Sequence, residues 1–231
     1  MLRNVSLKIQ SGQKFSLVGV NGAGKSTFIK LLLRLYDPTE GQILLDDVDI
    51  TKLDLCEYRK KFSIIFQDFK IFSFTIKENI AFDKSTYDDN KIQKTIEEVG
   101  LDKRIAQLKY GLQTYVFKNY ENDGIEFSGG ELQKIALARA LVRSSNFLVF
   151  DEPTSAMDAI AESNFYKFID DKLTGKTSII VSHRISSTSC SDKIIVFDNG
   201  QIIESGTREE LLKLNGKFKE LYDMQAQYYV D

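Results

Sequence analysis

Residues 19–27 read GVNGAGKST and fit the pattern G-x-x-x-x-G-K-[ST]. The glycines of such a loop let backbone N–H groups turn inward around a triphosphate, while Lys25 supplies positive charge to the β- and γ-phosphate oxygens. Ser26 offers a hydroxyl to Mg²⁺, and the helix expected after the loop points its positive end at the same phosphates. The residues expected to contact a nucleotide are Asn21, Gly22, Ala23, Gly24, Lys25, Ser26 and Thr27.

Two acidic residues follow an apolar run in FLVFDE, residues 147–152. At the end of a strand, Asp151 is placed to hold Mg²⁺ through its water shell, and Glu152 can accept a proton from an attacking water. Alone, the run would fit a strand followed by a solvated acidic turn. Together with the glycine loop, it favours phosphoryl transfer to water.

The stretch EFSGGELQK, residues 126–134, places two adjacent glycines at the start of an expected helix. It holds no nucleophile beside a base and no set of metal ligands. Ser128 and Glu131 have the spacing of a capping box, which satisfies free N–H groups at a helix start. Glycines here also predict that another group approaches the backbone closely.

Strand and helix patterns alternate along the chain. A short apolar run at 14–20 precedes the glycine loop, and apolar residues recur at helical spacing over 24–36. Helical spacing dominates between about 75 and 145 and returns in one amphipathic helix expected over 208–230. Further strands are expected at 41–50, 61–68, 146–153, 176–184 and 192–203, and their β-branched runs are typical of buried strands in a parallel sheet.

Composition narrows the functional classes. The 231 residues carry a net charge of −2, so no overall basic field favours nucleic acid. Cys56 and Cys190 form no C-x-x-C pair and are expected to be reduced thiols. No apolar run approaches the roughly 18 residues of a membrane helix, and the first residues do not show the pattern of a signal peptide. The isolated chain is expected to be soluble and cytosolic.

In order and spacing, these motifs resemble those of the nucleotide-binding domains of ABC transporters. The loop at 19–27 resembles the Walker A motif, and 147–152 resembles Walker B. FSGGE at 127–131 resembles the signature motif, usually written L-S-G-G-Q. The resemblance covers essentially the whole chain.

Three further matches follow the family's order. Gln67 in IIFQD resembles the Q-loop glutamine, and His183 in VSHR resembles the switch histidine. Outside the resemblance, Gln67 would be read as a strand end and His183, the only histidine, as structural. The D-loop is matched by Ser155, Ala156, Met157 and Asp158.

The resemblance implies an α/β fold with a P-loop NTPase (RecA-like) core and a mainly parallel sheet. An antiparallel β portion is expected near the N-terminus. The core would comprise residues 1–69 and 146–231, and an inserted α-helical subdomain would comprise 70–145. The family's membrane domain and adenine-stacking aromatic residue would precede Met1, so weak ATP binding with little base selectivity is expected.

The resemblance also implies roles and partners. Lys25, Gln67, Glu152 and His183 would be catalytic; Ser26, Gln67 and Asp151 would organise Mg²⁺; and His183 would contact the γ-phosphate and orient the attacking water. ATP would be the substrate. Ser128, Gly129, Gly130 and Glu131 would act on the opposite protomer of a head-to-tail dimer. The remaining partner would be a transmembrane domain, contacted through its coupling helices at the cytoplasmic face of the membrane; nucleic acid is not expected.

Subclass can be read from FSFTIKENIAF, VSHRIS and DNGQIIESGTREELL, which are similar to exporters. DGIE at 123–126 resembles exporters of peptides such as bacteriocins and lantibiotics; a multidrug exporter is the other reading. A non-transport ABC ATPase and a regulatory module that only holds nucleotide remain alternatives. Four residues depart from the family pattern: Phe127 and Met157 replace leucines, Glu131 replaces glutamine, and Arg208 replaces histidine.

Overall fold

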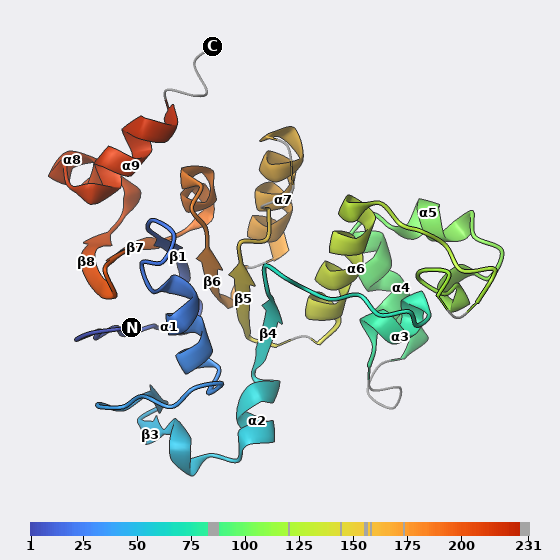
Figure 1. Ribbon diagram of the computed structural model, residues 1–231, viewed down its shortest axis with the longest axis horizontal. Helices are drawn as coiled ribbons and strands as arrows, with labels where there is room; N and C mark the ends of the chain where they lie inside the picture. Colours follow the sequence, from blue (N-terminus) through green and yellow to red (C-terminus); the bar gives the residue numbers. More distant parts are fainter. Residues whose placement is uncertain are drawn as a thin grey trace. The chain divides into compact units, whose positions relative to one another are not determined.

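The structure is a computed structural model that describes residues 1–82, 88–119, 121–143, 145–154, 157, 159–172 and 174–226. The chain forms two compact units (Figure 1). The first comprises Met1–Ile64 and Asn146–Asp231, and the second comprises Ile65–Ser145. The predicted α/β class with a mainly parallel sheet is confirmed.

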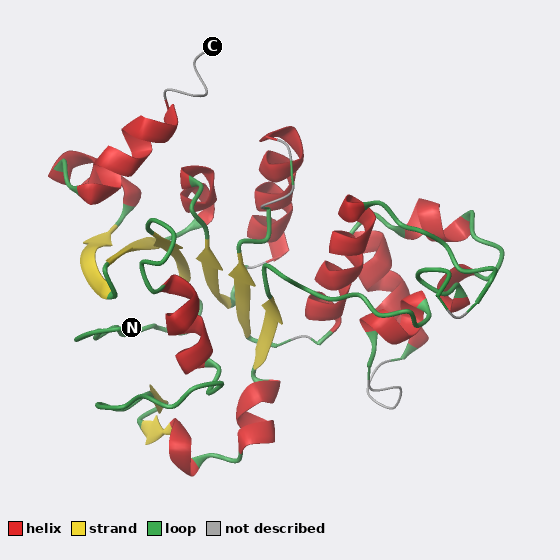
Figure 2. Ribbon diagram, in the orientation of Figure 1, coloured by secondary structure: helices red, strands yellow, loops and turns green. Residues whose placement is uncertain are grey.

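A six-stranded sheet in the order β4-β5-β6-β1-β7-β8 forms the centre of the first unit (Figure 2). Its strands are β1 (Lys14–Val18), β4 (Phe62–Ile65), β5 (Phe147–Asp151), β6 (Thr177–Val181), β7 (Lys193–Asp198) and β8 (Gln201–Gly206). Strand β1 pairs in parallel with β6 and β7, and β5 pairs in parallel with β6. Because Asp151 and Leu17 both lie opposite Val181, the carboxyl ends of β1, β5 and β6 meet at one edge of the sheet.

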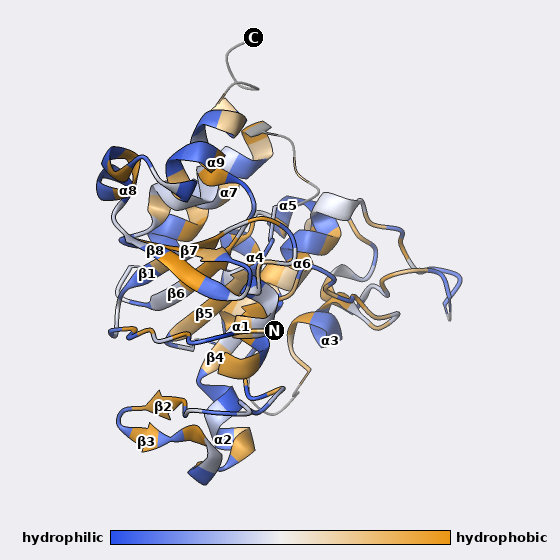
Figure 3. Ribbon diagram, turned by 60° about the vertical axis from the view of Figure 1, so that its left-hand side comes forward, coloured by the Kyte–Doolittle hydropathy of each residue, from blue (hydrophilic) through white to orange (hydrophobic). Residues whose placement is uncertain are grey.

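The helices of the first unit are α1 (Lys25–Leu32), η1 (Ile50–Lys52), α2 (Leu55–Lys60), α7 (Ala159–Lys172), η3 (Ile185–Cys190), α8 (Arg208–Leu214) and α9 (Lys217–Ala226). The central strands are mainly in the hydrophobic colours of Figure 3, and β6 is buried along its whole length. Among the described residues, no helix is long and apolar enough to cross a membrane.

The antiparallel β portion predicted near the N-terminus is confirmed as a small two-stranded sheet. It pairs β2 (Leu44–Leu45) with β3 (Val48–Asp49), where a single strand was expected over 41–50. Asp46 and Asp47 form the turn with φ of 51° and 64°. Positive φ at both central residues is the geometry of a tight type I′ hairpin, which divides the expected strand.

Two other elements expected near the C-terminal end are each divided in two. Of the strand expected over 192–203, β7 pairs in parallel with β1 as expected, whereas β8 returns antiparallel to β7 after a turn at Asn199 and Gly200 with φ of 45° and 81°. The single helix expected over 208–230 is two helices, because Asn215 adopts φ 52° and ends α8. A left-handed residue at a helix end is a common stop signal, and residues 227–230 lie outside the described part of the chain.

The second unit is mainly helical. It contains α3 (Ile76–Ile80), α4 (Asp89–Glu98), α5 (Asp102–Ala106), η2 (Gly111–Gln113) and α6 (Gly129–Val142). Helix α6 contacts both α3 and α4. Arg139 on α6 donates from Nε to the carbonyl of Asn79 at 2.7 Å and lies over the Phe82 ring at 4.8 Å. Burial lowers the pKa of this guanidinium to about 10. The Arg139 side chain thus joins α6 to α3.

Both cysteines are free thiols, as predicted. Cys56 is exposed, and burial raises the pKa of Cys190 to about 11. A thiol with a raised pKa is a poor nucleophile because little thiolate is present near neutral pH. Cys190 is therefore a poor candidate for reactive cysteine chemistry at physiological pH.

Candidate functional site

The glycine loop joins the end of β1 to the start of α1, which begins at Lys25. Gly22 and Gly24 adopt φ of 80° and 109°, which residues with a side chain rarely adopt. A Cβ atom on Gly24 would also lie 2.7 Å from a methyl carbon of Leu2. The loop therefore needs glycine at these positions, and α1 has the open N-terminus that favours an anion.

Lys25 is held inside this loop. Its Nζ donates to the carbonyl oxygens of Gly19 at 2.7 Å and Val20 at 3.1 Å. Burial lowers the pKa of Lys25, and the negative charges of Glu152 and Asp151 partly oppose the effect. An ammonium group has three donors, so one remains beyond the two that the loop carbonyls accept. A phosphate oxygen would accept the hydrogen bond of this third donor, and its negative charge would stabilise the buried ammonium group.

Asp151 is the last residue of β5 and is 7% exposed. Its Oδ1 atom has no hydrogen-bond partner among the described residues, and the nearby Ser26 hydroxyl acts to lower the pKa of the carboxyl group. Burial raises the pKa of Asp151; Glu152 reinforces the shift and Lys25 opposes it. A buried carboxylate oxygen without a partner costs free energy in the absence of a ligand.

The Ser26 hydroxyl and Asp151 fit a Mg²⁺ site because Mg²⁺ prefers hard oxygen ligands and retains water and phosphate oxygens. Within the described residues, no group of three or more His, Cys, Asp or Glu side chains could hold a metal alone. The unpartnered Oδ1 atom is the position where a Mg²⁺ ion would relieve the cost of burial.

We expect Asp151→Asn to raise the melting temperature by about 2–4 °C at pH 7, equivalent to ~1 kcal/mol, because it removes a poorly satisfied buried charge. Because the pKa of Asp151 is higher in the folded chain than its ordinary value of 3.8, the folded chain binds this proton more tightly than the unfolded chain does. Protonation therefore contributes its full stabilisation below pH 3.8, and the stabilisation is lost as the pH rises through the folded-state pKa. The gain should therefore disappear toward pH 3.8.

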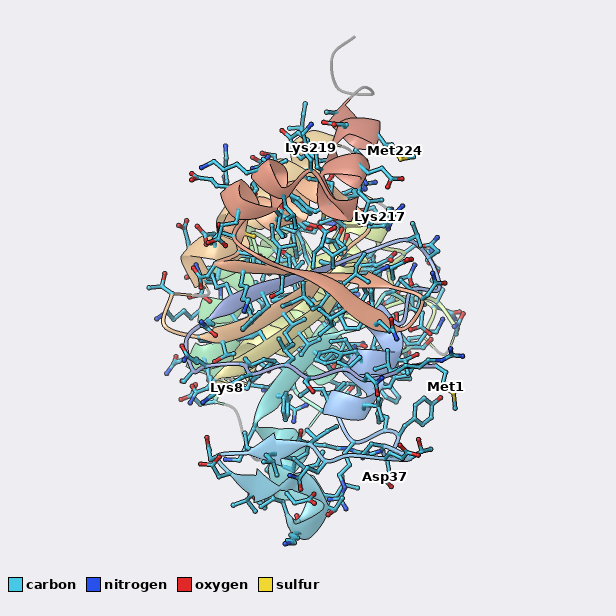
Figure 4. All side chains as sticks on the ribbon, turned by 90° about the vertical axis from the view of Figure 1, so that its left-hand side faces the viewer. Met1, Lys8, Asp37, Lys217, Lys219 and Met224 are labelled. Atoms are coloured by element: carbon cyan, nitrogen blue, oxygen red, sulfur yellow. The ribbon has the colours of Figure 1, made fainter. Side chains whose placement is uncertain are left out.

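Thermal unfolding followed by circular dichroism from pH 3.5 to 8 would measure this difference. Asp37→Asn is a control at an exposed aspartate (Figure 4) and should change little at any pH. A destabilised Asp151→Asn variant at pH 7 would show that the native carboxylate is well satisfied.

Glu152 and His183 lie at the ends of neighbouring strands. The Glu152 N–H donates to Val181 O at 2.9 Å, and Glu152 adopts φ 50°, which a non-glycine residue rarely does. This conformation sets its carboxylate 3.3 Å from Nδ1 of His183. The glutamate side chain is 13% exposed and the histidine side chain 45% exposed. A partly buried carboxylate beside a solvent-accessible imidazole can position a water and take its proton.

The remaining predicted residues of the first unit lie partly outside the described chain. Ser155, Ala156 and Asp158 of the D-loop are outside the described residues. The carbonyl of Met157 accepts a hydrogen bond from Arg184 at 3.3 Å. The roles of all four D-loop residues stay predictions.

Gln67 and the signature stretch belong to the second unit. Gln67 is exposed in a turn after β4, and its role toward Mg²⁺ stays a prediction. Ser128 is the N-cap of α6, and the predicted capping box with Glu131 is confirmed. The Glu131 backbone N–H donates to Ser128 Oγ at 3.3 Å, and the Ser128 N–H donates to the Glu131 carboxylate at 2.8 Å.

The chain itself does not explain the two glycines of the signature stretch. Gly129 and Gly130 are exposed, and a Cβ atom on either would meet nothing within 4 Å in the described structure. Neither has positive φ. Packing and backbone conformation would both accept a larger residue at these two positions, so approach by an external group stays the prediction for the glycines.

Two departures from the family pattern meet at one arginine. The Nε of Arg104 lies 3.0 Å from the Glu131 carboxylate, and its guanidinium lies over the Phe127 ring at 5.7 Å. The pKa of Glu131 is lowered chiefly by the Ser128 backbone hydrogen bond, with Arg104 adding to the effect. The charged Glu131 side chain is thus engaged within its own unit.

Residues that hold the His183 segment were missed by the sequence reasoning. The buried carboxylate of Glu162 on α7 accepts from Arg184 at 2.6 Å and from the Ser186 hydroxyl at 2.8 Å. Gln225 on α9 bonds the backbone on both sides of Arg184. These partners are 22 to 42 positions apart in sequence, so no local pattern could have indicated them.

The comparisons with known proteins agree with this geometry. The family model described as "ABC transporter" matches residues 2–155. The chain is 36% identical over 225 residues to the heterocyst differentiation ATP-binding protein HepA of Nostoc sp., covering 97% of this chain and 36% of that protein. It is 39% identical over 228 residues to the mitochondrial iron-sulfur clusters transporter ATM1 of Kluyveromyces lactis, covering 97% and 31%.

A solved structure of a bacterial Atm1-family ABC exporter with ATP bound is similar, with a TM-score of 0.88 and 35% identity. The match covers 97% of this chain and 39% of that one. The chain thus spans about a third of the length of the curated relatives that it matches. With the family matched over most of the chain and exporters among its relatives, it belongs to the ABC transporter family and is an ATP-binding domain of the exporter type.

Proposed function

We propose that this chain hydrolyses ATP in a Mg²⁺-dependent reaction and that hydrolysis powers export through a partner transmembrane domain. The observation that carries the proposal is the meeting of Glu152 and His183, 3.3 Å apart, at the sheet edge that also bears the glycine loop. A base, an orienting imidazole and a phosphate-binding loop are the parts that phosphoryl transfer to water requires.

In this mechanism, Lys25 and the loop amides bind the β- and γ-phosphates and hold them in line for attack. Glu152 accepts the proton of the attacking water, and His183 contacts the γ-phosphate and orients that water. Ser26, Asp151 and Gln67 would hold Mg²⁺, which when bound neutralises charge on the phosphate oxygens. The buried position of Asp151 and Lys25 strengthens their charge interactions because the local dielectric is low.

The working unit is proposed to be a head-to-tail dimer. The exposed N-terminus of α6, with Ser128 and two unconstrained glycines, would close over the γ-phosphate bound by a second copy. Helix α6 is 14 residues long, enough for a substantial dipole at this end. Each chain would therefore contribute its loop to one site and its signature stretch to the other.

Coupling to transport is proposed from the relatives' names. Relatives with comparable identity include an ATP-dependent lipid A-core flippase of Alcanivorax borkumensis and a probable multidrug resistance transporter of Bacillus subtilis. The chain would act at the cytoplasmic face of a membrane and contact the coupling helices of a transmembrane domain. The pairing of Glu152 with His183 favours turnover over a module that only holds nucleotide.

Phosphate release by the purified chain tests the proposed function. We expect release that requires both ATP and Mg²⁺, with a rate per molecule that rises with protein concentration because two chains build each site. The assay would span about 0.1–50 μM protein, a range chosen to cross weak dimer affinities. Release that is absent at every concentration, or independent of Mg²⁺, would contradict the proposal.

A further inference from the structure

The C-terminal helix α9 contacts the backbone around His183 through one side chain. Gln225 Nε2 donates to the carbonyl oxygen of His183 at 2.6 Å, and Gln225 Oε1 accepts from the N–H of Ile185 at 2.8 Å. Because an amide offers one donor end and one acceptor end, both bonds fix its orientation. The same side chain thus bridges the residue that faces Glu152 and the first residue of η3.

Helix α9 is itself firmly anchored in the first unit. Its Phe218 is fully buried in a cluster with Val18, Ile185, Ile194, Val196 and Leu211. Val18 ends β1, directly before the glycine loop, and Ile185 follows the His183 segment. One apolar cluster therefore connects α9 to the chain segments on both sides of the proposed phosphate site.

The opposite end of α9 is capped from the sheet. The Glu204 carboxylate on β8 accepts hydrogen bonds from the N–H groups of Lys217 and Phe218, the latter at 3.0 Å. These are two of the free donors at the start of the helix. With Phe218 buried and the helix start capped, α9 can hold Gln225 in a fixed place.

We propose that Gln225 is a positioning residue that sets the backbone of His183, so that α9 acts as a brace for the imidazole in hydrolysis. The proposal rests on the proposed function, in which His183 orients the attacking water. The His183 side chain is 45% exposed, so side-chain packing constrains it weakly and its backbone must be held from elsewhere. The same segment is also held from α7, where the Glu162 carboxylate forms an ion pair with Arg184 at 2.6 Å.

The first experiment compares Gln225→Ala with Met224→Ala in the full 231-residue chain. Met224 is the preceding residue on α9, is 55% exposed and is labelled in Figure 4. We expect Gln225→Ala to lower kcat about five- to tenfold with KM for ATP within about twofold, because a misplaced orienting group affects turnover more than binding. Met224→Ala should match the unchanged chain.

Gln225→Glu provides a second variant that keeps side-chain size. A carboxylate can still accept from the Ile185 N–H but cannot donate to the His183 carbonyl, so it should lower kcat to a similar extent as Gln225→Ala. If Gln225→Ala proves unstable by circular dichroism, the comparison of Gln225→Glu with Met224→Ala decides the result.

His183 is the only histidine in the chain, which permits a direct structural readout. With ring-labelled histidine and a purification tag free of histidine, the NMR spectrum should contain one imidazole Cε1–H signal. We expect a single narrow Cε1–H resonance in the unchanged chain and in Met224→Ala, and a shifted or broadened one in both Gln225 variants. An unchanged resonance in the Gln225 variants would overturn the proposal.

A double variant separates this proposal from the function on which it rests. His183→Ala should abolish most activity, and adding Gln225→Ala should then have no further effect, because Gln225 acts through the histidine. If the unchanged chain releases no phosphate, the proposed function is wrong; if His183→Ala leaves turnover unchanged, hydrolysis stands but the role of His183, and with it that of Gln225, is wrong. If His183→Ala is impaired while Gln225→Ala and Gln225→Glu keep normal kcat, only the bracing role is wrong.

Discussion

Glu152→Gln is expected to bind ATP as well as the unchanged chain and to hydrolyse it at least 10²-fold more slowly, since general-base catalysis contributes roughly 10²–10⁴-fold. Glutamine keeps the size of the side chain and can keep the left-handed backbone at this position, but it cannot accept the proton of a water. Lys25 and the loop amides, which bind the phosphates, are unchanged. ATP should therefore accumulate on the variant instead of turning over.

Single-turnover phosphate release and equilibrium binding of a fluorescent ATP analogue would measure the two effects separately. Glu209→Gln, on an exposed position of α8, makes the same chemical change away from the site and should leave both quantities unchanged. Hydrolysis at the normal rate in Glu152→Gln would remove Glu152 from the role of base. Loss of binding of the ATP analogue would instead show that the negative charge of Glu152 is needed to bind the nucleotide.

Mixing two inactive variants is expected to restore activity if each site is shared between two chains. Lys25→Ala removes the phosphate contact of the loop. Gly130→Asp places a carboxylate where a second chain's γ-phosphate would lie, yet it fits its own chain because a Cβ atom there meets nothing within 4 Å. An acidic residue in the first turn of α6 also interacts favourably with the positive end of the helix dipole, so the variant should fold normally.

Each variant alone should lose at least about tenfold in turnover, because both sites of a symmetric dimer carry the defect. In an equal mixture, half of the dimers are mixed, and each mixed dimer has one site built from an intact loop and an intact signature stretch. Recovery of about a quarter of normal activity is therefore expected. The measurement is steady-state phosphate release against mixing ratio at constant total protein.

Lys25→Ala mixed with Glu152→Gln is the matched control. Both changes affect the same side of the shared site, so every site of a mixed dimer carries one defect and no activity should return. Equal recovery in both mixtures, or none in the first, would contradict the head-to-tail arrangement.

Local chemistry made much of the fold predictable. The glycine loop and α1 follow from residues within one short stretch, and the Ser128–Glu131 capping box depends on two residues three positions apart. Buried parallel strands were readable because β5 and β6 are nearly continuous apolar runs. The errors occurred where residues with positive φ divided an expected segment, at Asp46–Asp47, at Asn199–Gly200 and at Asn215.

The sequence by itself determined the fold class, the phosphate-binding loop and the acidic strand end, because each is encoded by neighbouring residues. Only the tertiary structure decided that the Glu152 carboxylate lies 3.3 Å from the His183 ring and that Gln225 holds the histidine's backbone from α9. These contacts arise from strand register and from helix packing on a shared apolar cluster. Both are properties of the folded chain as a whole, which no local pattern specifies.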